Sequence, residues 1–307
     1  MAMPRSRLLD FIVYVAVRAA VCLFQALTDR AAVGVGRGLG WLVYVLDRRH
    51  RRVADDNLRH AFPHLDGPRR DRLVRTVFRH FATLLIDLAR LPRKLHRSNA
   101  ADHGDMSACR ELFAAIAGGR GTLLVSGHLG NWECAGYGLG LLGHRTHAVA
   151  RPLDNPYLDR LLRRFRENTG QRVLNKNGDA MLMAQILTGG GTLATLADQD
   201  AGPGGLFVEF FGRPASVHKG IAVMALKFDA QIFVAGLVKT GEPLRYRLEV
   251  EEVIDPRDYA GQLNAIKAIT QRYTAALERL IRRHPEQYFW LHRRWKSRPA
   301  ARTTRAA

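Results

Sequence analysis

The sequence predicts an α/β fold with a mostly parallel central sheet flanked by helices, and with an N-terminal membrane-anchoring helix. Short apolar runs typical of buried strands alternate with helical segments along the body of the chain, and the 47% hydrophobic composition supplies a core. The anchor is predicted from an apolar N-terminal stretch that approaches the width of a bilayer. With 307 residues, the chain is expected to form one large or two modest domains.

Charge and cysteine content narrow the function classes. The chain carries 47 Lys and Arg residues against 28 Asp and Glu residues, a formal net charge of +19. Such a balance indicates anionic partners: nucleic acid, anionic lipid or an acidic protein. The hydrophobic content excludes intrinsic disorder. Since Cys22, Cys109 and Cys134 are odd in number and lack metal-ligand spacing, we expect a reducing compartment and no zinc site.

The first part of the chain, residues 1–50, is expected to form the membrane anchor. Residues 11–27 are apolar apart from Arg18 and Gln25 and would cover roughly 25 Å as a helix, the short end of a bilayer span. A second apolar stretch, residues 31–46, is broken by one arginine and four glycines. Because Arg18 interrupts the first stretch, a cleaved signal peptide is disfavoured. A buried core helix of a soluble protein is the alternative.

A cluster of positive charge follows the second apolar stretch directly. It consists of Arg48, Arg49, Arg51 and Arg52. Such a cluster indicates contact with anionic headgroups, and it outweighs the two arginines that precede the first stretch, so the rest of the chain is expected on the cytoplasmic side. The glycines of residues 31–46 either support helix packing in lipid or belong to a loose interfacial segment.

The body of the chain, residues 51–296, is predicted as the globular domain, and residues 297–307 as a disordered basic tail. An amphipathic helical pattern covers residues 53–97, followed by a polar break and a helix that stops at Gly118. Expected strands cover residues 122–126, 147–150, 172–174, 192–197, 231–238 and 245–253. Expected helices begin near Trp132 and cover residues 156–168, 178–187, 219–228 and 262–283.

The loop after the first of these strands is the first candidate site, because ligands of such sheets bind at the carboxyl ends of the strands. It covers residues 127–133, with the sequence Gly-His-Leu-Gly-Asn-Trp-Glu. If His128 lies in the turn and Glu133 in the first helical turn, the carboxylate can fix the imidazole tautomer and leave His128 as a general base. The helix N-terminus would add N–H groups for a developing oxyanion. From spacing alone, an ordinary surface or capping pair is the more common explanation.

Several motifs in order along the chain resemble those of one enzyme family, the late acyltransferases of lipid A biosynthesis (lauroyl/myristoyl acyltransferases). Residues 127–133 are similar to the family's His-x4-Asp/Glu motif. Residues 151–159 resemble its Arg-Pro-x-x-Asn-Pro-x-x-Asp motif, and residues 197–203 resemble its Asp-Gln-Asp segment. Residues 285–296 resemble its C-terminal signature, and residues 52–63 resemble the segment that follows its anchor. Together these motifs are far more specific than the His-x4-Glu pair alone.

This resemblance implies a glycerolipid-acyltransferase-like domain at the inner membrane, facing the cytoplasm. It would move a fatty acyl chain from acyl carrier protein to a hydroxyl of a Kdo-bearing lipid A precursor. The family's catalytic pair falls on His128 and Glu133, and its substrate-binding residues fall on Arg151, Arg166 and Asp200. Neither a metal nor a cofactor is expected, because ester formation from a thioester needs only an activated hydroxyl and an oxyanion site. The implied partners, an acidic carrier protein, a phosphorylated glycolipid and anionic membrane lipid, suit the positive charge.

Alternatives stay open for several of these residues and for the acceptor. Arg151 could end a strand with a solvated side chain. Arg166 could lie on a solvated helix face, and Arg164 is the near-register alternative to it. Asp198 and Asp200 could cap or order a loop. A related acyltransferase could use acyl-CoA and act on phosphatidylinositol mannoside, a lysophospholipid or an ornithine-type lipid. A non-enzymatic protein that binds membrane or nucleic acid is disfavoured, because the basic residues are spread along the whole chain.

Overall fold

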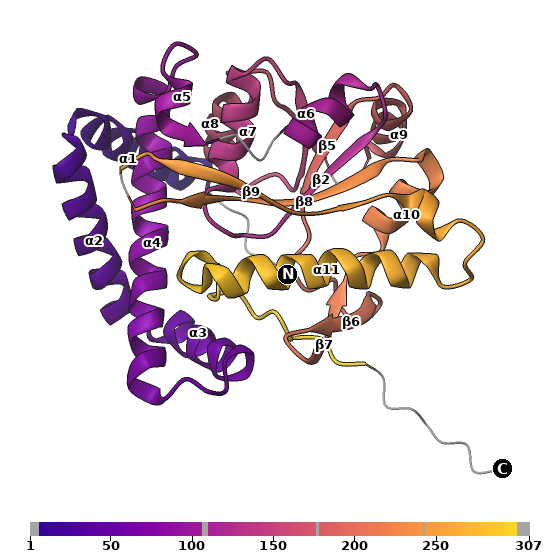
Figure 1. Cartoon of the computed structure of the whole chain (residues 1–307). Coiled ribbons are helices and arrows are strands. Elements are labelled where there is room, and N and C mark those ends of the chain that lie inside the picture. Colours follow the sequence, from indigo (N-terminus) through magenta and orange to yellow (C-terminus); the bar gives the residue numbers. More distant parts are fainter. Residues whose placement is uncertain (1–5, 106–109, 176–177, 242, 300–307) are drawn as a thin grey trace.

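The predicted α/β architecture is confirmed by a computed structural model that describes residues 6–105, 110–175, 178–241 and 243–299. A seven-stranded sheet has the order β1-β9-β8-β2-β5-β3-β4 (Figure 1). Its strands are β1 (Gly104–Asp105), β2 (Thr122–Ser126), β3 (Thr146–Ala150), β4 (Arg172–Asn175), β5 (Thr192–Leu196), β8 (Gln231–Lys239) and β9 (Tyr246–Ile254). All neighbouring strands are parallel except β8 and β9, which are antiparallel. The strands β9 and β1 at one edge therefore run opposite to the other five strands.

Helices cover both faces of this sheet, as parallel strands require. They are α6 (Arg110–Ala117), α7 (Trp132–Leu141), α8 (Pro156–Glu167), α9 (Ala180–Thr188), α10 (Gly220–Phe228) and α11 (Ala265–Arg283). In Figure 1, α6, α7 and α8 lie above β8 and β9, and α10 and α11 lie below. Two hydrophobic clusters result: Val125 of β2 packs toward α11, while its neighbour Leu124 packs with the cluster that contains Tyr137 of α7.

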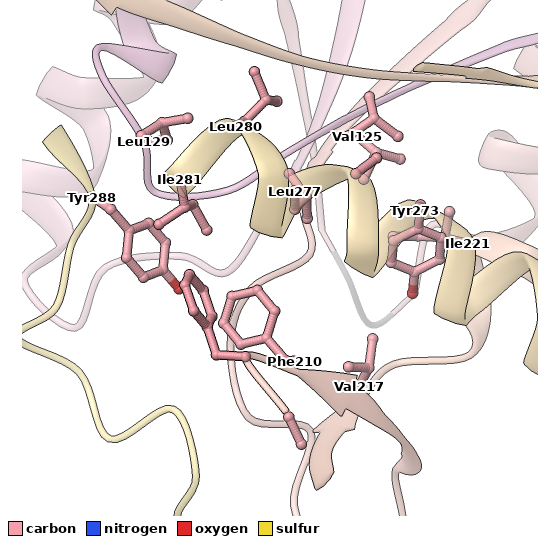
Figure 2. Packing of buried hydrophobic residues seen from close by; sticks show 14 of the residues in the cluster. Val125, Leu129, Phe210, Val217, Ile221, Tyr273, Leu277, Leu280, Ile281 and Tyr288 are labelled. Carbon is pink, nitrogen blue, oxygen red and sulfur yellow. The ribbon is translucent and has the colours of Figure 1, made fainter. Parts of the chain in front are cut away.

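A two-stranded antiparallel hairpin, β6 (Leu206–Phe210) and β7 (Arg213–Val217), is an element that the sequence pattern did not predict. It packs against α11 on the side away from the sheet, and Figure 2 shows Phe210 and Val217 below the helix, with Val125 and Leu129 above it. The hairpin therefore closes the larger core cluster. Short helices complete the described residues: α5 (Ala100–His103) and the 3-10 turns Pro256–Tyr259 and Pro285–Gln287.

The N-terminal helices form a layer beside the sheet: α1 (Arg7–Ala26), α2 (Asp29–Leu46), α3 (Arg48–Ala61) and α4 (Gly67–Lys94). The helical pattern expected over residues 53–97 is divided between two helices, because α3 ends at Ala61 and α4 begins at Gly67. Pro63 removes a backbone donor and restricts the residue before it, and Asp66 then caps the new helix by accepting the N–H of Arg69 at 2.8 Å. The turn folds α3 back against α4 (Figure 1).

Close packing explains two of the four glycines of α2. A Cβ placed on Gly36 would lie 2.8 Å from the hydroxyl oxygen of Thr83, and one on Gly40 would lie 2.5 Å from the Cα of Arg79. Both clashes are with α4, whereas Gly34 and Gly38 have nothing within 4 Å of an added Cβ. Of the two interpretations of these glycines, helix packing therefore holds for Gly36 and Gly40, and the partner is α4.

The helix α1 leaves most of its apolar side chains exposed. Of the described residues, only this helix is both long enough and apolar enough to cross a membrane, which makes it a candidate anchor by length and composition. Its polar contacts face the protein: the Gln25 side chain donates to the carbonyl of Ala89 in α4, and Asp10 is buried. Large side chains such as Leu9, Ile12 and Leu23 point away from the fold and are more than half exposed.

Two expectations fall partly outside the described residues. Cys109 lies outside them, while Cys22 is an exposed free thiol and Cys134 a buried one. Of the expected basic tail, residues 300–307 also lie outside. Ser297, the first residue of that segment, is fixed to the domain, because its hydroxyl donates to Asp200 at 2.8 Å.

Candidate active site

His128 and Asp198 meet at the carboxyl ends of two neighbouring parallel strands. The register pairs Ser126 at the end of β2 with Leu196 at the end of β5, and the two side chains lie at the same offset beyond these strands. The Asp198 carboxylate holds His128 twice: Oδ1 lies 2.8 Å from the imidazole Nδ1, and Oδ2 accepts the backbone N–H at 2.8 Å. Gly127 leaves room for this contact, since an added Cβ would lie 3.3 Å from the carboxylate carbon.

This pairing sets the chemistry of the ring. With the Nδ1 proton donated to the carboxylate, the neutral imidazole carries its lone pair on Nε2, where it can accept a proton. Burial acts to lower the pKa of His128, but the charge and hydrogen bond of Asp198, together with the charge of Glu133, raise it above its ordinary value. Burial alone would raise the pKa of Asp198, yet the same pairing holds it well below its usual range. Asp198 is therefore ionised beside a histidine whose pKa is raised.

Glu133 does not occupy the position expected for it. It lies in the first turn of α7 with its carboxylate directed at α8, where the Arg166 guanidinium binds both oxygens at 2.8 and 2.5 Å. The expectation that Glu133 orients the imidazole is thus corrected: Asp198 forms that hydrogen bond, and Glu133 acts on His128 through its charge. The physical reason is that Asp198 comes from the adjacent strand end, whereas Glu133 follows the helix away from the ring.

Aromatic rings and the C-terminal segment enclose the imidazole. Trp132 contacts it edge-on at 4.9 Å between ring centroids, and Phe289 and His292 lie at 6.1 and 6.3 Å. His292 supports the loop of Asp198, since its Nε2 lies 3.2 Å from the Asp198 carbonyl. Burial lowers the pKa of His292. The C-terminal signature thus forms one wall of the site.

The turn between His128 and α7 is fixed by a buried polar network. Gly130 has φ of +60°, and an added Cβ would lie 2.0 Å from the Leu237 carbonyl, so only glycine fits.

Asn131 caps α7 by accepting the Cys134 N–H at 3.0 Å and donates to the Tyr246 hydroxyl at 3.0 Å. That hydroxyl donates in turn to Asp87 at 2.7 Å, and Lys239 also binds Asp87, at 2.5 Å.

Two backbone donors stay open at the start of α7. Within the described part of the chain, the N–H groups of Trp132 and Glu133 have no hydrogen-bond acceptor. The first N–H groups of a helix point toward its N-terminal end, where the helix dipole favours negative charge. They follow His128 by four and five residues, the Trp132 ring contacts the imidazole, and both N–H groups are available for an oxyanion.

An apolar cavity of about 140 Å³ lies beneath the strand ends on the α7 face of the sheet. Its wall includes Leu124, Ala148, Ala194, Leu237 and Leu248, and the Glu133–Arg166 pair contributes its polar side. Ala148 and Ala194 face each other in the register of β3 and β5, so two small side chains leave this space open. The cavity suits a hydrocarbon chain whose reactive end is polar.

The other predicted site residues lie in different surroundings. Arg151 is 83% exposed and has Asp154 as its ion-pair partner at 3.3 Å. Asp200 orders the loop and the C-terminal segment by accepting hydrogen bonds from Ser297 and from the Gly202 N–H. The structure therefore places Glu133 and Arg166 in the cavity wall, and His128 lies beside that wall through its contact with Trp132, which also lines the cavity. In the described ranges, no three His, Cys, Asp or Glu side chains are grouped to hold a metal ion.

The motif over residues 151–159 has a structural explanation. Asn155 caps α8 by accepting the N–H groups of Tyr157 and Leu158, and its amide donates to the Asp10 carbonyl of α1 at 2.9 Å. Asp159 accepts the N–H of Leu153 at 2.8 Å. The Asn155 bond ties the exposed apolar helix α1 to the loop after β3, at the carboxyl ends of the strands.

Residues 2–297 match the sequence model of a protein family, the bacterial lipid A biosynthesis acyltransferases. The chain belongs to this family. The acyltransferase is 24% identical to a lipid A biosynthesis palmitoleoyltransferase of Escherichia coli over 88% of its own length and 86% of that protein. It is 25% identical to a lipid A biosynthesis lauroyltransferase of the same species over 86% of its own length and 85% of that protein. A phosphatidylinositol mannoside acyltransferase of Mycolicibacterium smegmatis is 28% identical over 69% of this chain and 70% of the relative.

Proposed function

We propose that this acyltransferase transfers a fatty acyl chain from acyl carrier protein to a hydroxyl of a Kdo-bearing lipid A precursor, with His128 as the general base. The observation that carries the proposal is the His128–Asp198 hydrogen bond next to an apolar cavity and two open N–H groups. A base, an acyl pocket and an oxyanion site are the three parts that transfer from a thioester to an alcohol requires.

The reaction proceeds by proton transfer and acyl exchange. His128 Nε2 accepts the proton of the acceptor hydroxyl while the hydroxyl oxygen attacks the thioester carbonyl carbon. Negative charge develops on the carbonyl oxygen, near the N–H groups of Trp132 and Glu133. Asp198 stabilises the imidazolium without taking its proton. When the carbon–sulfur bond breaks, the proton passes from His128 to the departing thiolate, which restores the neutral ring.

Glu133 and Arg166 are assigned a positioning role in this mechanism. Their bidentate pair joins α7 to α8 at the cavity and is largely shielded from solvent, with side-chain exposures of 9% and 18%. The negative charge of Glu133 also supports the imidazolium. Arg151 and Asp200 stay as proposed substrate-binding residues, Arg151 at the exposed edge beside α8 and Asp200 through the loop that it shares with Asp198.

The proposed location is the cytoplasmic face of the inner membrane. Support comes from the exposed apolar surface of α1, which Asn155 ties to the catalytic edge, and from the net charge of +19, which suits an acidic carrier protein and a phosphorylated glycolipid. The similarity to a phosphatidylinositol mannoside acyltransferase supports the second candidate, a related reaction on that type of lipid.

Mass spectrometry of lipids from a deletion strain tests the acceptor directly. Loss of one acyl chain from lipid A, restored by the wild-type gene and not by the His128→Ala gene, is the expected result. Loss of a chain from a mannoside or another lipid, with lipid A unchanged, would transfer the assignment to the second candidate. An unchanged lipid profile would contradict both.

A further inference from the structure

A basic hollow lies outside the catalytic pocket, between α3, the edge of β7 and the C-terminal segment. Its volume is about 750 Å³. Six of its lining side chains are cationic: Arg48, Arg49, Arg52, Arg213, Arg293 and Lys296. The lining contains one carboxylate, Asp56. Two basic runs that are far apart in the sequence, after α2 and in the C-terminal signature, thus meet around one concave surface.

The cations of this hollow outnumber the carboxylates near them, which are Asp56 in the lining and Asp47, whose pKa the charge of Arg49 helps to lower. Within the described ranges, none of the six forms an ion pair with a carboxylate. The arginines of α11 behave differently, because Arg272, Arg279 and Arg283 bind the glutamates of β9. Unpaired charges of one sign around a concavity focus a positive potential there. The hollow therefore favours an anion from outside the protein.

The wall of the hollow also holds an unused hydrogen-bond donor. Trp295 lines it, is 8% exposed, and its indole N–H has no hydrogen-bond partner in the described part of the chain. The Arg213 guanidinium lies 5.9 Å from the indole ring centroid. Buried donors are nearly always paired in folded proteins, so the wall carries an unsatisfied donor whose nitrogen is itself enclosed by the protein.

The hollow is joined to the catalytic site through the C-terminal segment. Asn57, on its α3 wall, donates to the carbonyls of Trp290 and His292, both at 2.8 Å. His292 in turn contacts the Asp198 carbonyl at 3.2 Å. The C-terminal segment at residues 290–292 therefore links the wall of the hollow to Asp198, whose carboxylate holds the proposed base.

Apolar surface leads directly to this hollow. The exposed side chains of α2 include Trp41 and Leu42, and the helix ends at Leu46, which is 70% exposed. Arg48, the second residue after Leu46, is already part of the hollow. An apolar surface followed by a basic concavity matches an amphiphile with an anionic head better than it matches a soluble anion or an acidic protein.

We propose that the hollow binds the phosphate group of a lipid headgroup, with the lipid's apolar part along α2. This inference rests on the proposed function in one respect, namely that the lipid is the acyl acceptor. The guanidinium groups bind phosphate oxygens in the bidentate manner that favours arginine at such sites. Exposed Arg52 and Arg293 from the two opposite walls would hold the same headgroup.

Vesicle flotation of the full chain tests this site without any acyl donor. The probe is a phosphatidylcholine vesicle with or without phosphatidic acid, and the variant is Arg52→Gln/Arg293→Gln. The control is Arg145→Gln/Arg172→Gln, which removes the same charge from exposed positions at the amino ends of the parallel strands β3 and β4. The hollow variant is expected to lose about 30-fold in partition onto phosphatidic acid vesicles, from two headgroup contacts, and the control only a few-fold.

Equal losses of vesicle binding in the two variants would overturn the proposal. It would also be overturned if inorganic phosphate bound the hollow of the wild type while the Arg52→Gln/Arg293→Gln variant bound vesicles as well as the wild type. In transfer assays, a raised KM for the lipid acceptor alone supports it. A raised KM for the carrier-protein donor alone would mean that an acidic protein docks there and would also overturn it. Since flotation needs no catalysis, the hollow variant would still lose binding if the proposed acyl transfer itself failed.

Discussion

At the residue scale, two carboxylates near His128 have different tasks. Asp198 binds the Nδ1 side of the ring and its backbone N–H, which fixes both the tautomer and the ring direction. Glu133 is bound by Arg166 and reaches the ring through its charge alone. The division follows from topology, because the strand end of β5 lies directly beside that of β2.

Replacing Asp198 by Asn tests its positioning role. Asparagine fills the same space without the charge, so the imidazolium is less stable and the turnover number should fall about a hundredfold or more. The neutral ring is the active form, so activity rises with pH through the pKa of His128. That pKa is raised in the wild type, and loss of the Asp198 charge lowers it. The acid limb of the pH–rate profile should therefore move to lower pH. A lower rate with an unmoved acid limb would contradict this role.

The sequence predicted His128 as the central residue but not its partner. Asp198 was assigned only a loop-capping alternative, although a signal was present: His128 and Asp198 each follow the end of a predicted strand within two residues. Using that signal needs the knowledge that these two strands are neighbours, which a single sequence does not supply. The Arg166–Glu133 pair likewise depends on how α8 packs beside α7, as Tyr137 and Phe165 show by stacking at 5.2 Å.

At the element scale, the contact between α2 and α4 depends on two of the four glycines in α2. Gly40→Ala should destabilise the protein by about 1–3 kcal/mol, because its Cβ would meet the backbone of Arg79. Gly38→Ala is the matched control and should be neutral or stabilising by up to about 1 kcal/mol, since alanine favours a helix and nothing lies near it. Thermal unfolding in detergent measures both. Equal effects at the two positions would exclude the close contact.

The strands β3 and β5 set the size of the proposed acyl pocket through small side chains. Ala148→Leu adds bulk between them, so the preferred acyl donor should become shorter while donors of that shorter length are still used. Competition between carrier-protein donors of different chain lengths measures the preference. A variant that is slower with every length equally would place the acyl chain elsewhere.

Elements with a strong local pattern were predicted well. The predicted strand 122–126 agrees with β2. The helices predicted to begin at residues 156 and 219 start within one residue of the observed starts of α8 and α10. The break at Pro63 was missed, because the amphipathic period continues on both sides of it. The hairpin β6–β7 was missed since its burial depends on α11, which follows it by about fifty residues.

At the scale of the whole molecule, apolar and basic surfaces are organised around the N-terminal helices. The helix α1, with its apolar surface, is joined through Asn155 to the carboxyl edge of the sheet, where the candidate site lies, and the basic hollow follows the end of α2. The net charge of +19 predicted anionic partners, but its arrangement is a property of the folded chain. Arginines of α11 are neutralised by β9, whereas those of the hollow stay unpaired.

The exposed face of α1 should determine membrane binding. Ile12→Arg is expected to move the protein from the membrane fraction to the soluble fraction, because it places a charge in the apolar surface that would enter lipid. Leu263→Arg is the control, since Leu263 is fully exposed before α11 and far from α1 in sequence. The fractions are measured after cell lysis, with thermal unfolding to show that both variants fold. Release by both variants, or by neither, would contradict an anchoring role for this face.

The most direct test of the account is single-turnover acyl transfer by His128→Ala in purified, folded enzyme. The substrates are an acyl carrier protein thioester and a Kdo-bearing lipid A precursor. We predict a loss of about 10²–10⁴-fold in the transfer rate, the usual contribution of a general base, with vesicle binding unchanged. Transfer at the wild-type rate by this variant would contradict the assignment of His128 as the catalytic base.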